Sequence, residues 1–371
     1  MRNKIKKPIT LFHPYLPEKA KERARKTLDT RWLGQGPQVD EFEKYFEKKI
    51  SHKHKAIAVN SGTSALHLSY ILAGIKDGDE VITPVFSCSA THTPLLYQRA
   101  KIIFADIQPD TLNISPKHVG ELMNERVKAI VCTHYGGLPC DMNELQAIAR
   151  KWNVPIIEDA AQAIGSSYRG KNIGAISEFT AFSFQAIKIL TTADGGMMTI
   201  KDRLLEEKAK RIRWFGIDRK AKFEDRWKKD IWEIGYKYQM TDISAALGIE
   251  ALKQLKKTLH HHRKMFELYK KELADIPGIK FIGEKGGRKS SCWLATTIVE
   301  RSDDLKRKLK EHNIESDPVH YRCDRYSVFG GRADNCPNMD SLENKYLILP
   351  MHYFVTLNDI KRICRAIKSG W

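Results

Sequence analysis

Short apolar runs alternate with amphipathic helical patterns along the first half of the chain. The runs are rich in Ile, Val, Ala and Phe, and they predict β-strands at residues 56–59, 80–82, 101–105, 129–133, 155–157, 179–184 and 197–200. A helical pattern separates several of them, for instance at 142–152, where Leu145, Ile148 and Ala149 share one face. Because strands that are apolar along their whole length are buried on both faces, the pattern indicates an α/β fold with a mostly parallel sheet between helices.

A longer helical pattern begins at Thr241, continues to about Leu273 and ends before Pro277-Gly278. The 371 residues are enough for two to three domains. We place the domain junction within this helix. Residues 1–245, including an N-terminal arm, are expected to form a large domain, and residues 246–371 a smaller C-terminal α+β domain.

Hydropathy argues against a membrane protein. No apolar run approaches the roughly 20 residues that a membrane span needs. The basic residues 1–7 are not followed by the apolar core of a secretory signal. We therefore expect a cytoplasmic protein with no membrane partner.

The cysteines argue against a metal site and against disulfides. The seven are scattered without any Cys-x-x-Cys pair, at Cys88, Cys132, Cys140, Cys292, Cys323, Cys336 and Cys364. An odd number without a secretory signal indicates reduced thiols. We expect no metal.

The net charge of +18 raises the question of an anionic partner. Lysine and arginine are spread along the chain, and no zinc finger, RNA-binding aromatic motif or basic arm accompanies them, so nucleic acid is not the expected partner. A solvated surface is the commoner explanation of such a charge. A second explanation is attraction of a doubly charged small substrate, such as a nucleotide diphosphate.

A strand, a tight polar turn and a helix follow one another at residues 59–68. Such a turn directs unpaired backbone N–H groups, the positive end of a helix dipole and hydroxyls at one point, which suits a phosphate. The alternative is an ordinary helix start capped by Ser61 or Thr63. The turn follows the first strand of the sheet and precedes Asp159 and Lys188 in the chain, and this position favours a phosphate-binding role.

An acid and a lysine follow two neighbouring strands. Asp159 ends one apolar run, and Lys188 comes just after the next. Pyridoxal phosphate (PLP) needs this arrangement, because an acid keeps its pyridine nitrogen protonated and a lysine forms the Schiff base. A lysine alone is more often a surface charge, but Ile187, Ile189 and Leu190 around this one predict desolvation and a lowered pKa.

These motifs, in this order and spacing, resemble the sugar-nucleotide aminotransferases of the DegT type, which are PLP enzymes of fold type I. The resemblance extends over nearly the whole chain. It rests on the segments 61–66, 158–162, 183–188 and 195–197, on an N-terminal signature at 32–37, on the loop 235–242, and on His320-Tyr321.

The resemblance implies a role for each matching residue. Lys188 forms the Schiff base and then acts as general acid–base, and Asp159 pairs with the pyridine nitrogen. The remaining implied cofactor residues are Gly62, Thr63 and Ser183 at the phosphate and Gln162 near the phenolic oxygen; the implied substrate residues are Trp32, His320 and Tyr321. The donor is usually glutamate, the acceptor is a keto sugar on a nucleotide, and two subunits form a homodimer with shared active sites.

Three positions depart from the family pattern. Cys88 stands where an aromatic ring usually stacks on the pyridine, so either this thiol or the nearby Phe86 covers the ring. Lys237 replaces an asparagine that meets the phosphate of the neighbouring subunit, and a lysine can do so as a point charge. Phe215 stands where many relatives have a histidine. These changes affect how the cofactor is held, not its presence.

Two alternatives remain on the same fold. One is a PLP-dependent sugar dehydratase. Dehydratases of this family have lost the Schiff-base lysine, and the presence of Lys188 argues against this alternative. The other is a non-catalytic regulator that binds nucleic acid. The sequence leaves open which nucleotide the substrate carries and whether the amino group enters at C-3 or at C-4 of the sugar. Family frequency favours a 4-keto-6-deoxy sugar, and the expected product is an amino sugar for a surface polysaccharide such as the lipopolysaccharide O-antigen.

Overall fold

A large mixed sheet forms the centre of the computed structural model, which describes residues 7–283 and 286–371. Its strand order is β1 (Lys55–Val59), β10 (Gly196–Ile200), β9 (Phe179–Ser183), β6 (Ile156–Asp159), β5 (Val127–Thr133), β2 (Glu80–Pro84) and β4 (Lys101–Ala105). Strand β10 runs opposite to the other six strands of this sheet, which are parallel to one another. The predicted α/β fold with a mostly parallel sheet is confirmed.

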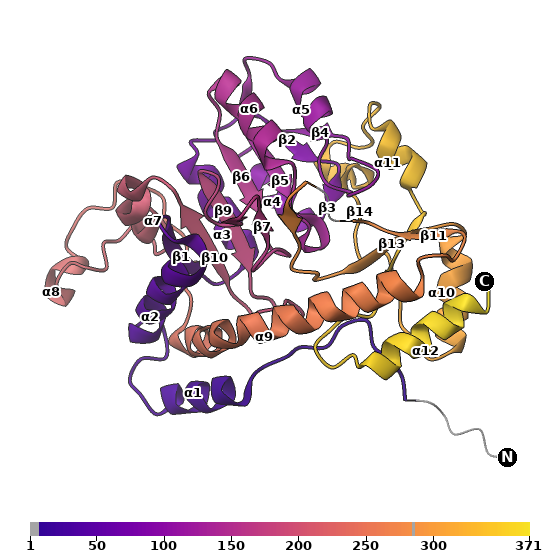
Figure 1. Cartoon of the computed structure of the whole chain (residues 1–371). Coiled ribbons are helices and arrows are strands. Elements are labelled where there is room, and N and C mark those ends of the chain that lie inside the picture. The colour runs from indigo at the N-terminus through magenta and orange to yellow at the C-terminus, as the bar shows by residue number, and fades with distance from the viewer. Residues whose placement is uncertain (1–6, 284–285) are drawn as a thin grey trace.

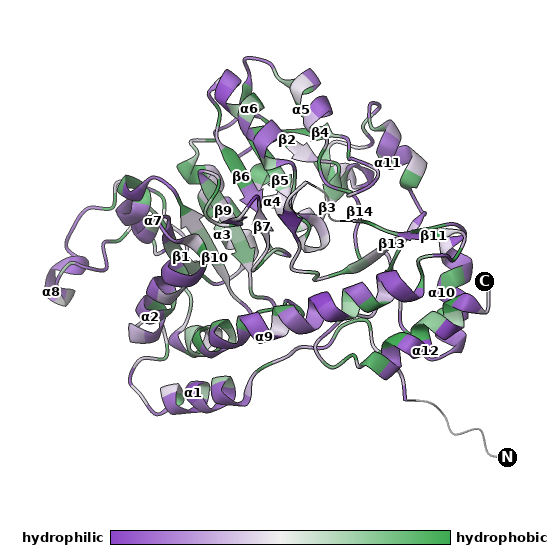
Figure 2. Ribbon diagram, in the orientation of Figure 1, coloured by the Kyte–Doolittle hydropathy of each residue, from purple (hydrophilic) through white to green (hydrophobic). Residues whose placement is uncertain are grey.

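Helices cover both faces of this sheet (Figure 1). They are α2 (Pro37–Phe46), α3 (Gly62–Leu72), α4 (Ser89–Tyr97), α5 (Pro116–Leu122), α6 (Met142–Trp152) and α7 (Glu206–Ile212). Strand β1 illustrates why both faces are apolar: Ala56 and Ala58 belong to one hydrophobic cluster, while Ile57 and Val59 belong to another. Figure 2 accordingly shows apolar residues along the central strands and polar residues on the outer faces of the helices.

The long helix α9 (Asp242–Glu272) links this sheet to a smaller antiparallel one (Figure 1). The hydroxyl of Thr241 caps the helix by accepting a hydrogen bond from the backbone N–H of Ser244 at 3.2 Å. The second sheet has the order β11 (Ile279–Phe281), β13 (Ala295–Val299) and β15 (Tyr346–Leu349), and it packs with α10 (Ser302–Glu311) and α12 (Leu357–Lys368). The predicted helix is confirmed, and the domain boundary between residues 245 and 246 stays a prediction.

Smaller elements bring distant parts of the chain together. Strand β14 (Tyr321–Arg322) pairs with β3 (Phe86–Ser87), and Ile9 pairs with Ile314 in an isolated bridge. The other elements are β12 (Arg288–Lys289), β7 (Ser167–Tyr168), β8 (Lys171–Asn172), α1 (Glu18–Leu28), α8 (Phe223–Arg226), α11 (Pro337–Leu342) and single turns at Glu47–Ser51, Tyr135–Gly137, Arg203–Leu205, Cys323–Arg325 and Ser327–Phe329. None of the helices in the described part of the chain has the length and apolar character to cross a membrane.

Candidate active site

The start of helix α3 lies directly against the end of strand β9. Ser61 caps the helix, its hydroxyl accepting from the backbone N–H of Ser64 at 3.0 Å. A Cβ atom on Gly62 would lie 2.7 Å from the Cβ of Ser183, and one on Gly196 would overlap the carbonyl of Ser61. The two glycines therefore let the helix start approach the sheet closely. They place the first turn of α3, which begins with Gly62-Thr63, next to Ser183, and N–H groups and hydroxyls in such a place would suit a phosphate.

Asp159 ends strand β6 in a buried position, with both carboxylate oxygens held. Oδ2 accepts a hydrogen bond from the hydroxyl of Thr91 at 2.6 Å, and Oδ1 accepts one from the backbone N–H of Ala161 at 3.0 Å. Thr91, in the first turn of α4, was not identified from the sequence. Its signal there is weak, because a threonine near a helix start is usually a local cap.

Gln162 is held by its carbonyl oxygen. Its Oε1 accepts from the backbone N–H of Gly136 at 2.6 Å, and the hydroxyl of Ser291 donates to its backbone carbonyl at 2.8 Å. No residue within 7–283 or 286–371 accepts a hydrogen bond from its amide nitrogen. The amide N–H₂ thus remains as a donor for an oxygen of a bound molecule.

Lys188 lies in the loop after β9, close to the face of Trp293. Its Nζ is 3.7 Å from the centroid of that ring, and the indole N–H of Trp293 donates to the carbonyl of Ile187 at 3.0 Å. Burial lowers the pKa of Lys188 to about 8, against the opposing influence of Cys88 and Asp159. A lowered pKa is what the apolar neighbours in the sequence predicted. Trp293 was missed, because nothing in the sequence connects it with Lys188.

His320 faces Lys188 from the C-terminal part of the chain. Burial first, and the charge of Lys188 second, lower the pKa of His320 to about 3, so its ring is neutral. Its Nδ1 is buried and has no hydrogen-bond partner within the part of the chain that the structure describes. Pairing of Tyr321 with Ser87 brings these residues to the segment that contains Cys88. The structure thus gathers Cys88, Asp159 and His320 around Lys188.

Phe86 and Cys88 differ in their surroundings. Phe86 is buried between Tyr135 and Tyr346, with ring centroids 4.8 and 5.0 Å away. Cys88 is only partly buried, and it lies close enough to Lys188 to influence the pKa of that lysine. This difference favours Cys88 as the side chain that covers the cofactor ring.

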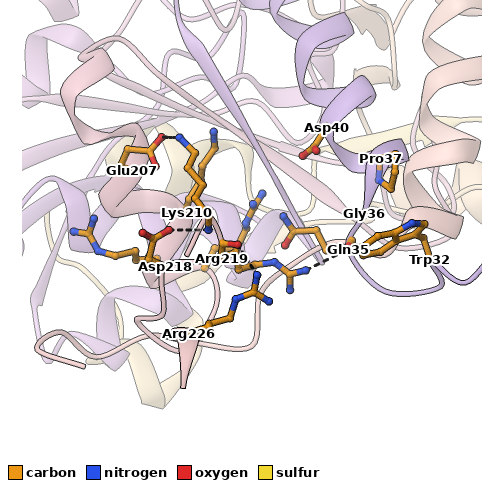
Figure 3. A pocket seen from close by; sticks show the side chains of 13 residues that line it. Trp32, Gln35, Gly36, Pro37, Asp40, Glu207, Lys210, Asp218, Arg219 and Arg226 are labelled. Atoms are coloured by element: carbon orange, nitrogen blue, oxygen red, sulfur yellow. Dashed lines mark hydrogen bonds and ion pairs between the residues drawn. The ribbon is translucent and has the colours of Figure 1, made fainter. Parts of the chain in front are cut away.

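Trp32 lies apart from this group. Its half-exposed ring lines a cavity of about 650 Å³ together with Gln35, Arg219 and Arg226, and none of the residues around Lys188 lines it (Figure 3). The side chain of Arg219 points toward Gln35 and donates to its carbonyl at 3.2 Å. The substrate role predicted for Trp32 therefore belongs to a different cavity within one chain.

Lys237 lies beside Asn60, which precedes the turn at Ser61, and it is not among the residues that line the small cavity at Lys188. Its exposed ammonium is 5.4 Å from the centroid of the Phe215 ring, and its backbone carbonyl accepts from the amide of Asn60 at 3.1 Å. Two of the positions that depart from the family pattern thus contact each other. The predicted contact of Lys237 with a phosphate in the neighbouring subunit stays a prediction.

The gathered side chains fit PLP. The closely packed start of α3 suits the phosphate, and buried Asp159 suits the pyridine nitrogen. The unused amide of Gln162 suits the phenolic oxygen, and Lys188 supplies an amine with a lowered pKa.

Comparison with known proteins agrees with this chemistry. The model of the DegT/DnrJ/EryC1/StrS aminotransferase family matches residues 14–368. GDP-perosamine synthase of Escherichia coli O157:H7 is 30% identical over 98% of both chains. UDP-4-amino-4,6-dideoxy-N-acetyl-beta-L-altrosamine transaminase of Campylobacter jejuni is 32% identical over 98% of this chain and 99% of its own. The crystal structure of the sugar aminotransferase CalS13 from Micromonospora echinospora superimposes with a TM-score of 0.92 at 29% identity, over 98% of this chain and 100% of its own.

Proposed function

Because the chain belongs to the DegT/DnrJ/EryC1/StrS aminotransferase family, whose enzymes act on sugars with PLP as cofactor, we propose that it moves an amino group from glutamate to a 4-keto-6-deoxy sugar on a nucleoside diphosphate. The observation that carries the proposal is the placement of Lys188, an amine with a lowered pKa that faces Asp159 and His320. A dehydratase that lacks this lysine does not fit that arrangement.

Each residue around Lys188 has a proposed role that follows from its position in the site. PLP supplies the electron sink that lets a carbon–hydrogen bond of the substrate ionise. Lys188 would bind the cofactor, and its Nζ would then serve as the acid–base group that moves a proton between the cofactor carbon and the substrate carbon. Asp159 holds the ring nitrogen, and neutral His320, whose Nδ1 has no partner among the described residues, is placed to bind a hydroxyl of the sugar.

The names of relatives support the type of acceptor. One relative is named for a 4-amino-4,6-dideoxy sugar on UDP, and another for a GDP sugar. The name of the UDP-sugar transaminase is the source of our proposal for amination at C-4 and for a 6-deoxy sugar. The nucleotide differs between the two relatives, UDP in one and GDP in the other. We propose a cytoplasmic homodimer with shared sites that makes an amino sugar for a surface polysaccharide such as the O-antigen.

A panel assay tests this function. Purified protein is given glutamate and one of several 4-keto or 3-keto sugar nucleotides, and 2-oxoglutarate is measured. We expect 2-oxoglutarate to exceed one equivalent per subunit only in the presence of a 4-keto-6-deoxy sugar nucleotide, because without an acceptor each bound cofactor can take an amino group from glutamate only once. Lys188→Ala protein is the blank. If the protein binds PLP with a visible absorption band but shows no turnover of glutamate with any acceptor in the panel, the dehydratase or the regulator would be supported instead.

We propose that the cavity at Trp32 holds the nucleoside diphosphate of a substrate whose sugar reaches Lys188 of the neighbouring subunit in the proposed homodimer, because the cavity lies apart from Lys188 of its own chain. Arg219 lies 4.6 Å from the centroid of the Trp214 ring, and no acidic residue within the described ranges forms an ion pair with it. Burial, with Arg226 and Arg213 nearby, lowers the pKa of Arg219. A diphosphate in the cavity would offset this concentration of positive charge, and Trp32 offers an exposed ring for the base.

Replacing Arg219 with glutamine is expected to raise KM for the sugar nucleotide by about tenfold or more, because a charge-assisted contact to phosphate is lost. The value of kcat and the KM for glutamate should stay near those of wild type. Arg25→Gln on α1, where the arginine is largely exposed, is the control for a loss of one charge. Equal KM values in Arg219→Gln and wild-type protein would place the nucleotide elsewhere.

Lys237→Ala is expected to weaken PLP retention, and added salt should weaken retention more in wild-type protein than in this variant. A mixed dimer of one Lys237→Ala subunit and one Lys188→Ala subunit tests whether the contact crosses the interface. If it does, one site keeps both lysines and binds PLP normally. If Lys237 acts within its own subunit, neither site is native.

A further inference from the structure

Buried hydroxyls form a continuous row that ends at the carboxylate of Asp159. The oxygens of Thr133 and Ser87 are 3.0 Å apart, those of Ser87 and Thr91 are 2.6 Å apart, and Thr91 donates to Asp159 Oδ2 at 2.6 Å. All four side chains are buried. They come from β5, β3, α4 and β6, so the row crosses four elements.

Counting protons gives the row a direction. Each hydroxyl has a single hydrogen, and that of Thr91 is used on Asp159. Ser87 must therefore donate to Thr91, and Thr133 must donate to Ser87. Every hydroxyl dipole then points toward Asp159, and bonds aligned in this way strengthen one another.

We propose that Thr91 is a positioning residue for the cofactor, which fixes the rotation of the Asp159 carboxylate so that it meets the pyridine nitrogen. The torsion of a carboxylate about its last bond is soft and has two broad minima. Without Thr91, only the backbone N–H of Ala161 would define that rotation. With both contacts, each oxygen still has a free acceptor direction, and the plane of the group is set.

Thr91 is itself firmly placed. Its backbone carbonyl accepts from the hydroxyl of Tyr70 at 2.7 Å, and its backbone N–H donates to the carbonyl of Cys88 at 3.0 Å. The first turn of α4 thus connects Cys88, proposed to cover the cofactor ring, with Asp159, proposed to hold its nitrogen. A shift of this turn would move both contacts together.

The test compares three variants by two measurements that need no acceptor sugar: the rate at which holoprotein loses PLP on dialysis, and the visible absorption band of resting protein at one pH. Thr91→Val keeps the shape but removes the donor, and we expect PLP loss about tenfold faster or more, with a displaced band. Thr91→Ser restores the hydroxyl and should restore both values. Thr297→Val, which removes a buried hydroxyl that donates to the Leu347 carbonyl at 2.8 Å in the smaller sheet, should change neither.

The inference rests on the proposed role of Asp159, and Asp159→Asn separates the two. If Asp159→Asn alters the band while Thr91→Val leaves band and PLP loss as in wild type, the inference is wrong and the role of Asp159 stands. If neither Asp159→Asn nor Thr91→Val has an effect, the proposed role of Asp159 is wrong, and the inference about Thr91, which rests on it, is wrong as well. Should Thr91→Val not fold, Ser87→Ala breaks the next bond of the row, and a smaller change of the same sign is expected; no change would overturn the proposal.

Discussion

Lys188→Ala protein is expected to fold normally and to lose transamination by several orders of magnitude. The loss follows because a covalent catalyst is removed, and Lys188 is the one lysine within residues 7–283 and 286–371 that lies over the Trp293 ring. Lys188→Arg should be equally inactive, since a guanidinium keeps the positive charge but is not a nucleophile. Production of 2-oxoglutarate from glutamate measures the loss, and thermal unfolding checks the fold.

The surface provides a control for this prediction. Lys201 is half-exposed and pairs with Glu178 at 3.4 Å, so Lys201→Ala removes a lysine charge without touching the site. That variant should turn over like wild type. Turnover of Lys188→Ala protein within about tenfold of wild type would contradict the assignment.

The lowered pKa of Lys188 adds a dependence on pH. An amine reacts with an aldehyde only when neutral, and Lys188 becomes neutral as the pH rises through about 8. Capture of added PLP by protein freed of cofactor should therefore speed up toward that pH and level off above it. An exposed lysine, with an ordinary pKa near 10.4, would still be gaining speed there.

The strands of the large sheet were predictable because each is buried on both faces and is therefore apolar along its length. The runs at 56–59 and 101–105 correspond to β1 (Lys55–Val59) and β4 (Lys101–Ala105). The direction of β10 was not predictable in the same way. Its residues Gly196–Ile200 are apolar like those of the parallel strands, and burial does not distinguish the two directions.

The residues around Lys188 were predictable only where they follow strands in order. Asp159 and Ser183 end neighbouring parallel strands, which places them at one edge of the sheet. His320 reaches the same place through the pairing of β14 with β3, a contact between segments far apart in sequence. Trp293 and Thr91 arrive by tertiary packing, which leaves no local pattern, and only family resemblance brought His320 into the prediction.

Asp159→Asn is the sharpest test of how the cofactor is activated. The amide keeps the size of the side chain and its acceptor for the Ala161 N–H, so PLP should still bind and give a visible band. An amide cannot hold the pyridine nitrogen as a charged pair, so the ring becomes a weaker electron sink. We expect kcat to fall by about two to three orders of magnitude, as when a preorganised electrostatic contact is removed elsewhere.

Glu158→Gln is the matched control for Asp159→Asn, because Glu158 is the preceding residue of β6 and its carboxylate is also buried. The Glu158 carboxylate contacts residues other than those around Lys188: it accepts hydrogen bonds from His134 Nε2 at 2.8 Å and from the backbone N–H of Ser177 at 3.0 Å. The amide there should lower the melting temperature without a comparable loss of kcat, since none of these contacts reaches the cofactor. Full activity of Asp159→Asn would show that its carboxylate serves the fold alone. An equal loss of kcat in both variants would show that any change at the end of β6 disturbs the site, whatever its charge.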